Sequence, residues 1–232
     1  MDTVTISNLS KVYGEKTALA PTSLELAPGS LTAIVGKSGC GKTTLLRLLA
    51  GLEEPTTGTI TGLPAKVAPV FQEPRLMPWL TVADNITLAA ASDPSLAKSK
   101  DRLADLLDVL ELTGASALYP SQLSGGMAQR VSLGRTLFYN PELILMDEPF
   151  SALDYFTRRS LQQMLLRLFR NQTKTIVFVT HDVEEALLLG DRVLVMEEGA
   201  IKSALPVTLP HPRSATSPQF QQLRETILTL LK

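Results

Sequence analysis

The feature that most constrains this chain is a glycine-rich loop between an apolar run and a helical pattern. Residues 36–43, GKSGCGKT, have the spacing G-x-x-x-x-G-K-[ST], whose glycines let several backbone N–H groups turn toward phosphate oxygens. The apolar run Leu31–Val35 predicts a buried strand, and a helix is expected from about Lys42 to Leu52. This context favours a phosphate-binding loop over an ordinary glycine-rich turn, because the positive end of the helix dipole would face the same anion.

The loop also supplies side chains that suit a nucleoside triphosphate and its metal ion. The Lys42 ammonium is expected to reach the β- and γ-phosphates, and the Thr43 hydroxyl to bind Mg²⁺. We therefore predict a nucleotide-binding segment made of Gly36, Lys37, Ser38, Gly39, Cys40, Gly41, Lys42, Thr43 and Thr44.

Cys40 is the single cysteine of the chain and lies inside this loop. It cannot form an internal disulfide, which favours a reducing compartment. A nearby lysine and a helix N-terminus activate thiols, so thiol reagents are expected to inhibit the protein and the bound nucleotide to protect it. A small spacer residue without a regulatory role is the alternative interpretation.

Short apolar runs alternate with helix-period stretches, which indicates an α/β fold with a mainly parallel sheet flanked by helices. Wholly apolar strands of this kind are buried on both faces. Besides Leu31–Val35, the predicted strands are Val67–Phe71, Leu143–Met146, Lys174–Thr180 and Arg192–Met196. Two alternating stretches, Val4–Ser7 and Ser23–Leu26, are separated by Gly14 and Pro21 and predict an antiparallel β flank against the main sheet.

Strand signals stop between Gln72 and Ser124, where helix-period patterns take their place. We expect one domain over residues 1–205, with a helical subdomain of about residues 73–140 inserted in its core. A further amphipathic helix is expected from about Leu153 to Arg170.

Residues 206–232 are expected to form a proline-containing linker and an amphipathic C-terminal helix. Prolines 206, 210 and 212 interrupt the preceding pattern. Ser217 followed by Pro218 is typical of a helix start, and apolar residues from Phe220 onward then share one helical face. This arrangement favours a terminal helix docked on the body of the protein.

The composition excludes several classes of protein. The chain has 22 basic and 23 acidic side chains, which argues against binding to nucleic acid through a basic surface. Its apolar runs are shorter than the roughly 18–20 residues that span a bilayer, and residues 1–5 predict no signal peptide. Any membrane role is therefore expected to depend on a partner.

Two acids follow the strand predicted at Leu143–Met146. Asp147 at the strand tip suits a Mg²⁺ partner, directly or through water, and Glu148 can orient or deprotonate an attacking water. Two acids after a strand are more often a capped, solvated end, but the phosphate loop upstream favours the functional interpretation. The combination indicates nucleotide hydrolysis by a P-loop NTPase.

The segment Leu123–Arg130, LSGGMAQR, predicts a second anion site. Ser124 is expected to cap a helix whose glycines leave backbone amides open, without a lysine of its own. A chain with one phosphate loop and a separate anion-binding helix end favours a dimer, in which the second site of one copy closes on the phosphate held by the other.

This segment resembles the signature sequence of ABC ATPases, the nucleotide-binding subunits of ATP-binding-cassette transporters. The resemblance covers roughly Val4 to Ile201, with the motifs in the order of the family. It implies that two cassettes, copies of one chain or paralogues, sandwich two ATP molecules head to tail, with Ser124, Gly125 and Gly126 contacting the γ-phosphate bound to the partner. It also implies permease subunits, an indirect solute-binding protein, no nucleic acid, and a peripheral place on the cytoplasmic face of the inner membrane.

Further residues acquire roles through the resemblance. Tyr13 matches an aromatic residue that stacks on adenine, although an ordinary strand-edge tyrosine is the alternative. Gln72 matches a glutamine that senses Mg²⁺ and the attacking water, and Asp154 lies in a loop that bridges the two subunits. His181 matches a histidine that contacts the γ-phosphate, where a structural histidine is the alternative.

Residues 71–82 resemble the importer branch, especially cassettes serving nitrate, sulfonate, taurine and related small compounds. Trp79 is a candidate contact to the membrane subunit, and a buried aromatic is the alternative. Gly134 departs from the family, which commonly has alanine there, and predicts a cost of about 1 kcal/mol in helix stability. Two other functions remain open: an ABC-type ATPase not coupled to transport, and an ATP-binding switch without turnover.

Overall fold

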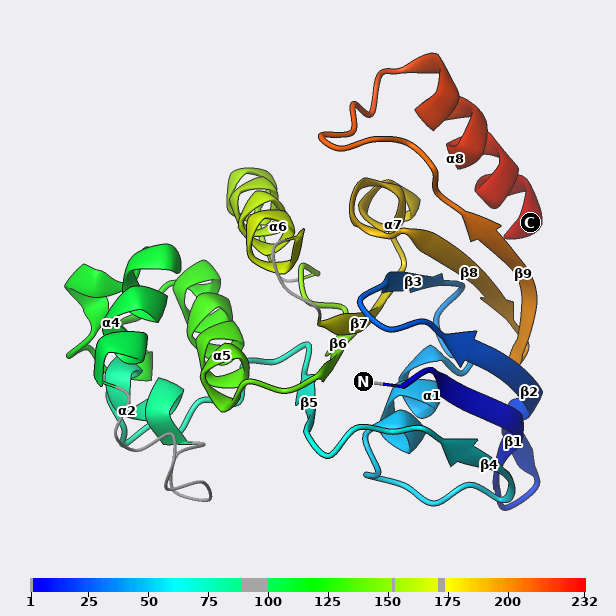
Figure 1. Ribbon diagram of the computed structural model, residues 1–232, viewed down its shortest axis with the longest axis horizontal. Helices are drawn as coiled ribbons and strands as arrows, with labels where there is room; N and C mark the ends of the chain where they lie inside the picture. The colour runs from blue at the N-terminus through cyan, green and yellow to red at the C-terminus, as the bar shows by residue number, and fades with distance from the viewer. Residues whose placement is uncertain (1, 89–99, 152, 171–173) are drawn as a thin grey trace.

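The computed structural model describes residues 2–88, 100–151, 153–170 and 174–232. Its centre is a six-stranded sheet in the order β5-β6-β7-β3-β8-β9 (Figure 1). The first five of these strands run parallel, and β9 is antiparallel to β8. The strands are β3 (Leu31–Val35), β5 (Val67–Val70), β6 (Leu143–Asp147), β7 (Thr175–Thr180), β8 (Arg192–Glu197) and β9 (Ala200–Pro206).

The predicted α/β class and all five predicted strands of the main sheet are confirmed. Their wholly apolar sequences follow from burial on both faces. Along β6, Leu143 and Leu145 belong to one apolar cluster, whereas Ile144 and Met146 belong to another. The expectation that Pro206 belongs to a linker is wrong, because this residue ends β9, paired with Arg192.

A separate three-stranded antiparallel sheet, in the order β2-β1-β4, lies beside this core. Its strands are β1 (Val4–Tyr13), β2 (Lys16–Leu26) and β4 (Thr57–Thr61). The predicted flank is therefore confirmed, but β1 and β2 are much longer than expected. Pro21 does not end β2, because β2 is an edge strand and tolerates a residue that lacks a backbone donor.

Helix α1 (Lys42–Leu49) contacts β2 on one side and β6 and β7 on the other, which places it between the two sheets. The helix ends three residues before the predicted Leu52. Gly51 has a φ of +65°, and the Leu52 N–H donates to Arg47 O at 2.9 Å, while the Gly51 N–H donates to Leu48 O at 3.1 Å. This pair of bonds closes the last turn and stops the helix.

Residues 82–88 and 100–139 form a helical arm that Figure 1 shows to one side of the sheets. It consists of α2 (Val82–Thr87), α4 (Lys100–Val109), two 3₁₀ turns (Thr113–Ala115 and Pro120–Gln122) and α5 (Gly125–Tyr139). Helices α2 and α4 both pack on α5. Gly134 of α5 is explained by this packing, because a Cβ there would lie 2.8 Å from Leu110 Cδ1 and 3.1 Å from Ile86 Cδ1.

Three further helices cover the core: α6 (Tyr155–Arg170), α7 (Val183–Leu189) and α8 (Pro218–Leu230). Helix α6 begins two residues after the predicted Leu153. The predicted start of α8 is confirmed, because Ser217 Oγ accepts a hydrogen bond from the Phe220 N–H. Phe220 and Ile227 are fully buried in the core, so α8 docks on the body as expected.

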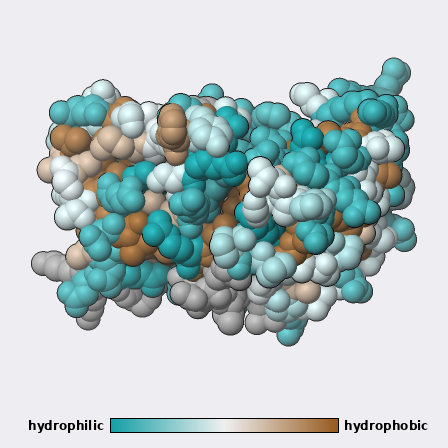
Figure 2. Space-filling view, turned by 90° about the horizontal axis from the view of Figure 1, so that it is seen from above, coloured by the Kyte–Doolittle hydropathy of each residue, from teal (hydrophilic) through white to brown (hydrophobic). Residues whose placement is uncertain are grey.

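The surface seen from above is mostly hydrophilic, with apolar side chains scattered among polar ones (Figure 2). None of the helices in the described part of the chain has the length and apolar character that crossing a membrane requires.

Candidate active site

Most of the predicted site residues gather at one edge of the main sheet. Strands β3, β5, β6 and β7 are parallel, so their carboxyl ends meet at the same edge, which is where ligands bind in sheets of this kind. The phosphate loop follows β3, and Gln72 follows β5. Asp147 and Glu148 lie at the end of β6, and His181 follows β7.

Close packing holds the phosphate loop in its turned conformation. Gly41 has a φ of +100°, and a Cβ at this position would overlap the backbone oxygen of Ala18. A Cβ on Gly36 would likewise overlap the backbone oxygen of Met196. The two glycines are therefore required by the approach of neighbouring strands as well as by the turn.

Lys42 is the buried cation at the centre of the loop, with 5% of its side chain exposed. Its ammonium donates to Gly36 O at 2.8 Å and to Lys37 O at 3.0 Å. It also lies 3.9 Å from Cys40 Sγ, and Cys40 is buried in the apolar cluster beneath α1. Burial of this thiol favours the spacer interpretation of Cys40, and the predicted thiol inhibition remains a prediction.

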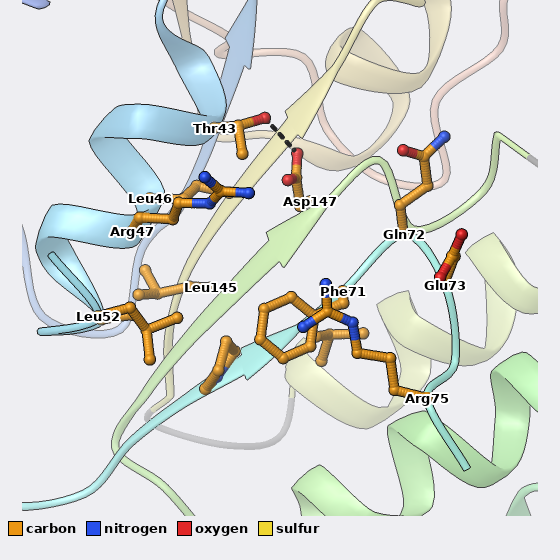
Figure 3. Close-up of a pocket in the computed structure, with 13 residues that line it drawn as sticks. Thr43, Leu46, Arg47, Leu52, Phe71, Gln72, Glu73, Arg75, Leu145 and Asp147 are labelled. Atoms are coloured by element: carbon orange, nitrogen blue, oxygen red, sulfur yellow. Dashed lines mark hydrogen bonds between the residues drawn. The ribbon is translucent and has the colours of Figure 1, made fainter. Parts of the chain in front are cut away.

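The Thr43 hydroxyl and the Asp147 carboxylate face each other across the strand ends. Thr43 Oγ1 donates to Asp147 Oδ1 at 3.1 Å (Figure 3). Burial raises the pKa of the Asp147 carboxyl, and the bond from Thr43 acts in the opposite direction. Thr43, Asp147 and Gln72 line one cavity together with residues of α1, β5 and β6.

Glu148 and His181 form the second contact of the site. His181 Nδ1 lies 3.2 Å from Glu148 Oε2. The backbone of Glu148 is unusual for a residue with a side chain, with a φ of +44°, and its N–H donates to Val179 O of β7 at 3.0 Å. Glu148 lines a cavity together with residues of the phosphate loop, among them Ser38, Gly39 and Thr44.

Tyr13, the last residue of β1, lines this second cavity as well. Its side chain is 44% exposed, and its hydroxyl donates to Glu53. That hydrogen bond raises the pKa of the Tyr13 phenol. The ring therefore lies beside the phosphate loop with its hydroxyl held to one side, which suits stacking on a flat ligand.

The signature segment lies apart from these residues, at the start of α5 in the helical arm. Ser124 Oγ accepts a hydrogen bond from the Met127 N–H, which confirms the predicted cap. A Cβ on Gly126 would overlap the Thr157 side chain of α6. The start of α5 is therefore next to the start of α6.

Asp154 caps α6 at this junction. Its carboxylate accepts hydrogen bonds from the Phe156 and Thr157 N–H groups and from the Thr157 hydroxyl. The Thr157 hydroxyl bond lowers the pKa of the Asp154 carboxyl, with further contributions from the backbone bonds. The structure thus brings Asp154 close to Gly126, and both lie outside the strand-end cluster.

Two contributors to the site were missed by the sequence analysis. Ser151 Oγ accepts a hydrogen bond from Gln72 Nε2 at 3.1 Å and donates to Glu148 O at 3.1 Å. Glu53 accepts the Tyr13 hydroxyl bond and lies in a loop whose sequence carries no signal for that role. The Trp79 side chain is 71% exposed, so the alternative of a buried aromatic is wrong.

Comparisons with known proteins agree on one family. A family model described as "ABC transporter" matches residues 19–151. The chain is 46% identical over 223 residues to the aliphatic sulfonates import ATP-binding protein SsuB 1 of Pseudomonas fluorescens, covering 96% of this chain and 84% of that protein. It is 44% identical over 228 residues to the SsuB protein of Granulibacter bethesdensis, covering 98% and 94%.

A solved structure has the same fold. The dimeric, post-hydrolysis structure of the ATP-binding cassette MJ0796 bound to ADP and phosphate superposes with a TM-score of 0.76 at 31% identity. The matched region covers 89% of this chain and 100% of the MJ0796 chain.

Proposed function

Because the chain belongs to the ABC transporter family of ATP-binding cassettes, we propose that its strand-end site binds Mg²⁺ with ATP and that hydrolysis there drives the import of an aliphatic sulfonate. The protein is an ABC-type ATPase that acts as a dimer with membrane permease subunits. The observation that carries the proposal is the convergence of the phosphate loop, Asp147, Glu148 and His181 at the carboxyl ends of adjacent parallel strands.

We propose that the backbone N–H groups of residues 36–44 and the Lys42 ammonium hold the β- and γ-phosphates. The burial of Lys42 supports this role, because a charge in a site shielded from water acts more strongly on a phosphate than an exposed one. The exposed ring of Tyr13 stacks on the adenine from the edge of the same cavity.

The residues at the strand ends fit Mg²⁺. This ion prefers oxygen ligands and binds through one or two carboxylates plus substrate phosphates, and Thr43 Oγ1 and Asp147 Oδ1 lie 3.1 Å apart. Thr43, Asp147 and Gln72 would hold the ion, directly or through water. When bound, it neutralises charge on the β- and γ-phosphates.

Glu148 is proposed as the general base. Its carboxylate takes a proton from a water whose oxygen bonds to the γ-phosphorus, while the bond from that phosphorus to the bridging oxygen of ADP breaks. His181 is held beside Glu148 by the 3.2 Å contact, which leaves its Nε2 available to the γ-phosphate oxygens. Gln72 is proposed to orient the same water.

The start of α5 supplies the second half of a composite site in the dimer. We propose that Ser124 and the backbone of Gly125 and Gly126 contact the γ-phosphate held by the partner subunit. Asp154 fixes the neighbouring loop, and its position next to Gly126 supports a shared interface.

For the organisation of the chain, we propose one ATPase domain that runs to the end of β9 at Pro206, with the helical region of about residues 73–140 inserted in it. Residues 207–232 form an appended linker and helix. The exposed Trp79 is proposed to contact a permease subunit, and the protein to sit on the cytoplasmic face of the membrane.

The proposed identity of the transported solute is tested by reconstituting the protein with its permease and solute-binding protein in lipid vesicles. We expect ATP-dependent uptake of a labelled alkanesulfonate, and loss of that uptake when Lys42→Ala replaces the wild-type chain. Uptake of nitrate in preference to alkanesulfonates would contradict the assigned solute. ATP hydrolysis without uptake of any of them would contradict coupling to import.

A further inference from the structure

We propose that Glu185 of α7 is a positioning residue for His181, and that Arg158 of α6 links it to the loop that carries Asp154. The inference rests on the proposed role of His181 in hydrolysis. It follows from a partly buried set of polar contacts between α6, α7 and the end of β7, outside the strand-end cluster.

The first part of this set fixes the backbone on either side of His181. Glu185 is 5% exposed, and its Oε2 accepts a hydrogen bond of 2.6 Å from the Thr180 hydroxyl. The same hydroxyl accepts a hydrogen bond from the Asp182 N–H at 3.0 Å. Thr180 precedes His181 and Asp182 follows it. The Thr180 hydroxyl, held by Glu185, therefore links the residues on both sides of the histidine.

The second part ties Glu185 to α6. Gln162 Nε2 donates to Glu185 Oε1 at 3.3 Å, and Arg158 Nε forms an ion pair with the same oxygen at 3.6 Å. The Arg158 guanidinium also lies 3.9 Å from Asp182 Oδ2 and donates to Leu153 O at 3.1 Å. Leu153 is the residue before Asp154, so one side chain contacts both the partner-facing loop and the residues beside His181.

His181 needs such support because its side chain is 65% exposed. Its position relative to Glu148 therefore depends on its backbone. A displacement of about 1 Å in a reacting group can lower a rate by a hundredfold. Loosening Thr180 would move His181 away from Glu148 without touching the residues that hold the nucleotide.

Arg158 also connects the loop that carries Asp154 to the residues beside His181. A displacement of the loop around Leu153 and Asp154 would move Arg158, and Arg158 contacts both Glu185 and Asp182.

The test compares matched variants of the full chain in a steady-state ATPase assay. For Glu185→Gln and Thr180→Val we expect kcat to fall between about tenfold and a hundredfold, with KM for ATP changed less than about twofold. Thr180→Ser keeps the hydroxyl and is expected to retain most of the activity. Glu184→Gln is the control, because Glu184 is the neighbour of Glu185 on α7 and pairs at 2.6 Å with Arg159 on the surface.

A His181→Ala background separates positioning from a general loss of structure. The effects of substitutions at residues that act together do not add. Glu185→Gln should therefore lower kcat by less than about a further twofold when the His181 side chain is already absent. An undiminished loss in that background, or equal activity of Glu185→Gln and Glu184→Gln, would overturn the proposal. Wild-type activity of His181→Ala alone would instead refute the proposed role of His181.

Discussion

The imidazole of His181 and the carboxylate of Glu148 are in direct contact, with Nδ1 and Oε2 3.2 Å apart. The two residues are 33 positions apart in sequence and meet because β6 and β7 are adjacent parallel strands. The positive φ of Glu148 turns its side chain toward the phosphate loop rather than along the strand. This contact joins the proposed base to the proposed phosphate sensor.

The Thr43–Asp147 pair predicts how the protein depends on Mg²⁺. We expect Asp147→Asn to weaken the apparent affinity for Mg²⁺ by about tenfold or more, because the proposed carboxylate ligand of the ion loses its charge. A magnesium titration of ATPase activity at saturating ATP measures the effect. Thr43→Ser keeps the hydroxyl and should titrate like the wild type, so equal weakening in both variants would contradict the assignment.

Tyr13 is expected to contribute to ATP binding through its ring. Stacking on a base is worth about 1–3 kcal/mol, so Tyr13→Ala should raise the Kd for ATP about tenfold. Tyr13→Phe loses the bond to Glu53 but keeps the ring, and should change the Kd less than about twofold. Titration with a fluorescent ATP analogue compares the two variants. An equal loss of affinity in both would show that the hydroxyl, and not the ring, is the group that binds.

Much of the strand-end site could be predicted from the sequence because its parts are local. The phosphate loop, the acids after β6 and the wholly apolar strands all have signals within about ten residues. Strands β4 and β9 gave no such signal, since β4 is mostly exposed, β9 is partly exposed, and neither has an apolar run. The contact of Glu185 with Gln162 joins residues 23 positions apart, and no local pattern reveals it.

Gly134 shows how packing reverses a local expectation. Alanine in a helix interior is about 1 kcal/mol better than glycine, yet a Cβ here meets the buried side chains of Leu110 and Ile86. Overpacking costs about 1–3 kcal/mol, so we expect Gly134→Ala to lower the free energy of unfolding by about 1 kcal/mol. Urea unfolding measures this.

Gly114→Ala is the control for that measurement, because a Cβ at Gly114 meets no atom within 4 Å. It should change stability by less than about 0.5 kcal/mol. A stabilised Gly134→Ala variant would show that the helical arm relaxes to admit the methyl group.

Glu185 predicts a dependence of stability on pH. Burial raises the pKa of its carboxyl above the ordinary value of 4.5, with Asp182 acting in the same direction and Thr180, Arg158 and His181 against it. The folded protein then binds more protons at this site than the unfolded chain. The resulting contribution of Glu185 to the free energy of unfolding is fully present below pH 4.5. It is lost as the pH rises through the pKa of this carboxyl in the folded protein.

The free energy of unfolding of the wild type relative to Glu185→Gln should therefore fall as pH rises from about 4.5 toward neutral. Paired urea titrations over this range measure the difference. A difference that stays constant or grows with pH would contradict the raised pKa.

The most direct test of the account is phosphate release by the purified full chain, comparing wild type with Glu148→Gln at saturating Mg-ATP. We predict that the substitution lowers the rate by at least about a hundredfold while ATP binding, measured in parallel by equilibrium titration, stays unchanged, because the general base is lost and the phosphate loop is intact. Phosphate release by Glu148→Gln at the wild-type rate would contradict the central claim that hydrolysis depends on Glu148 at the end of β6.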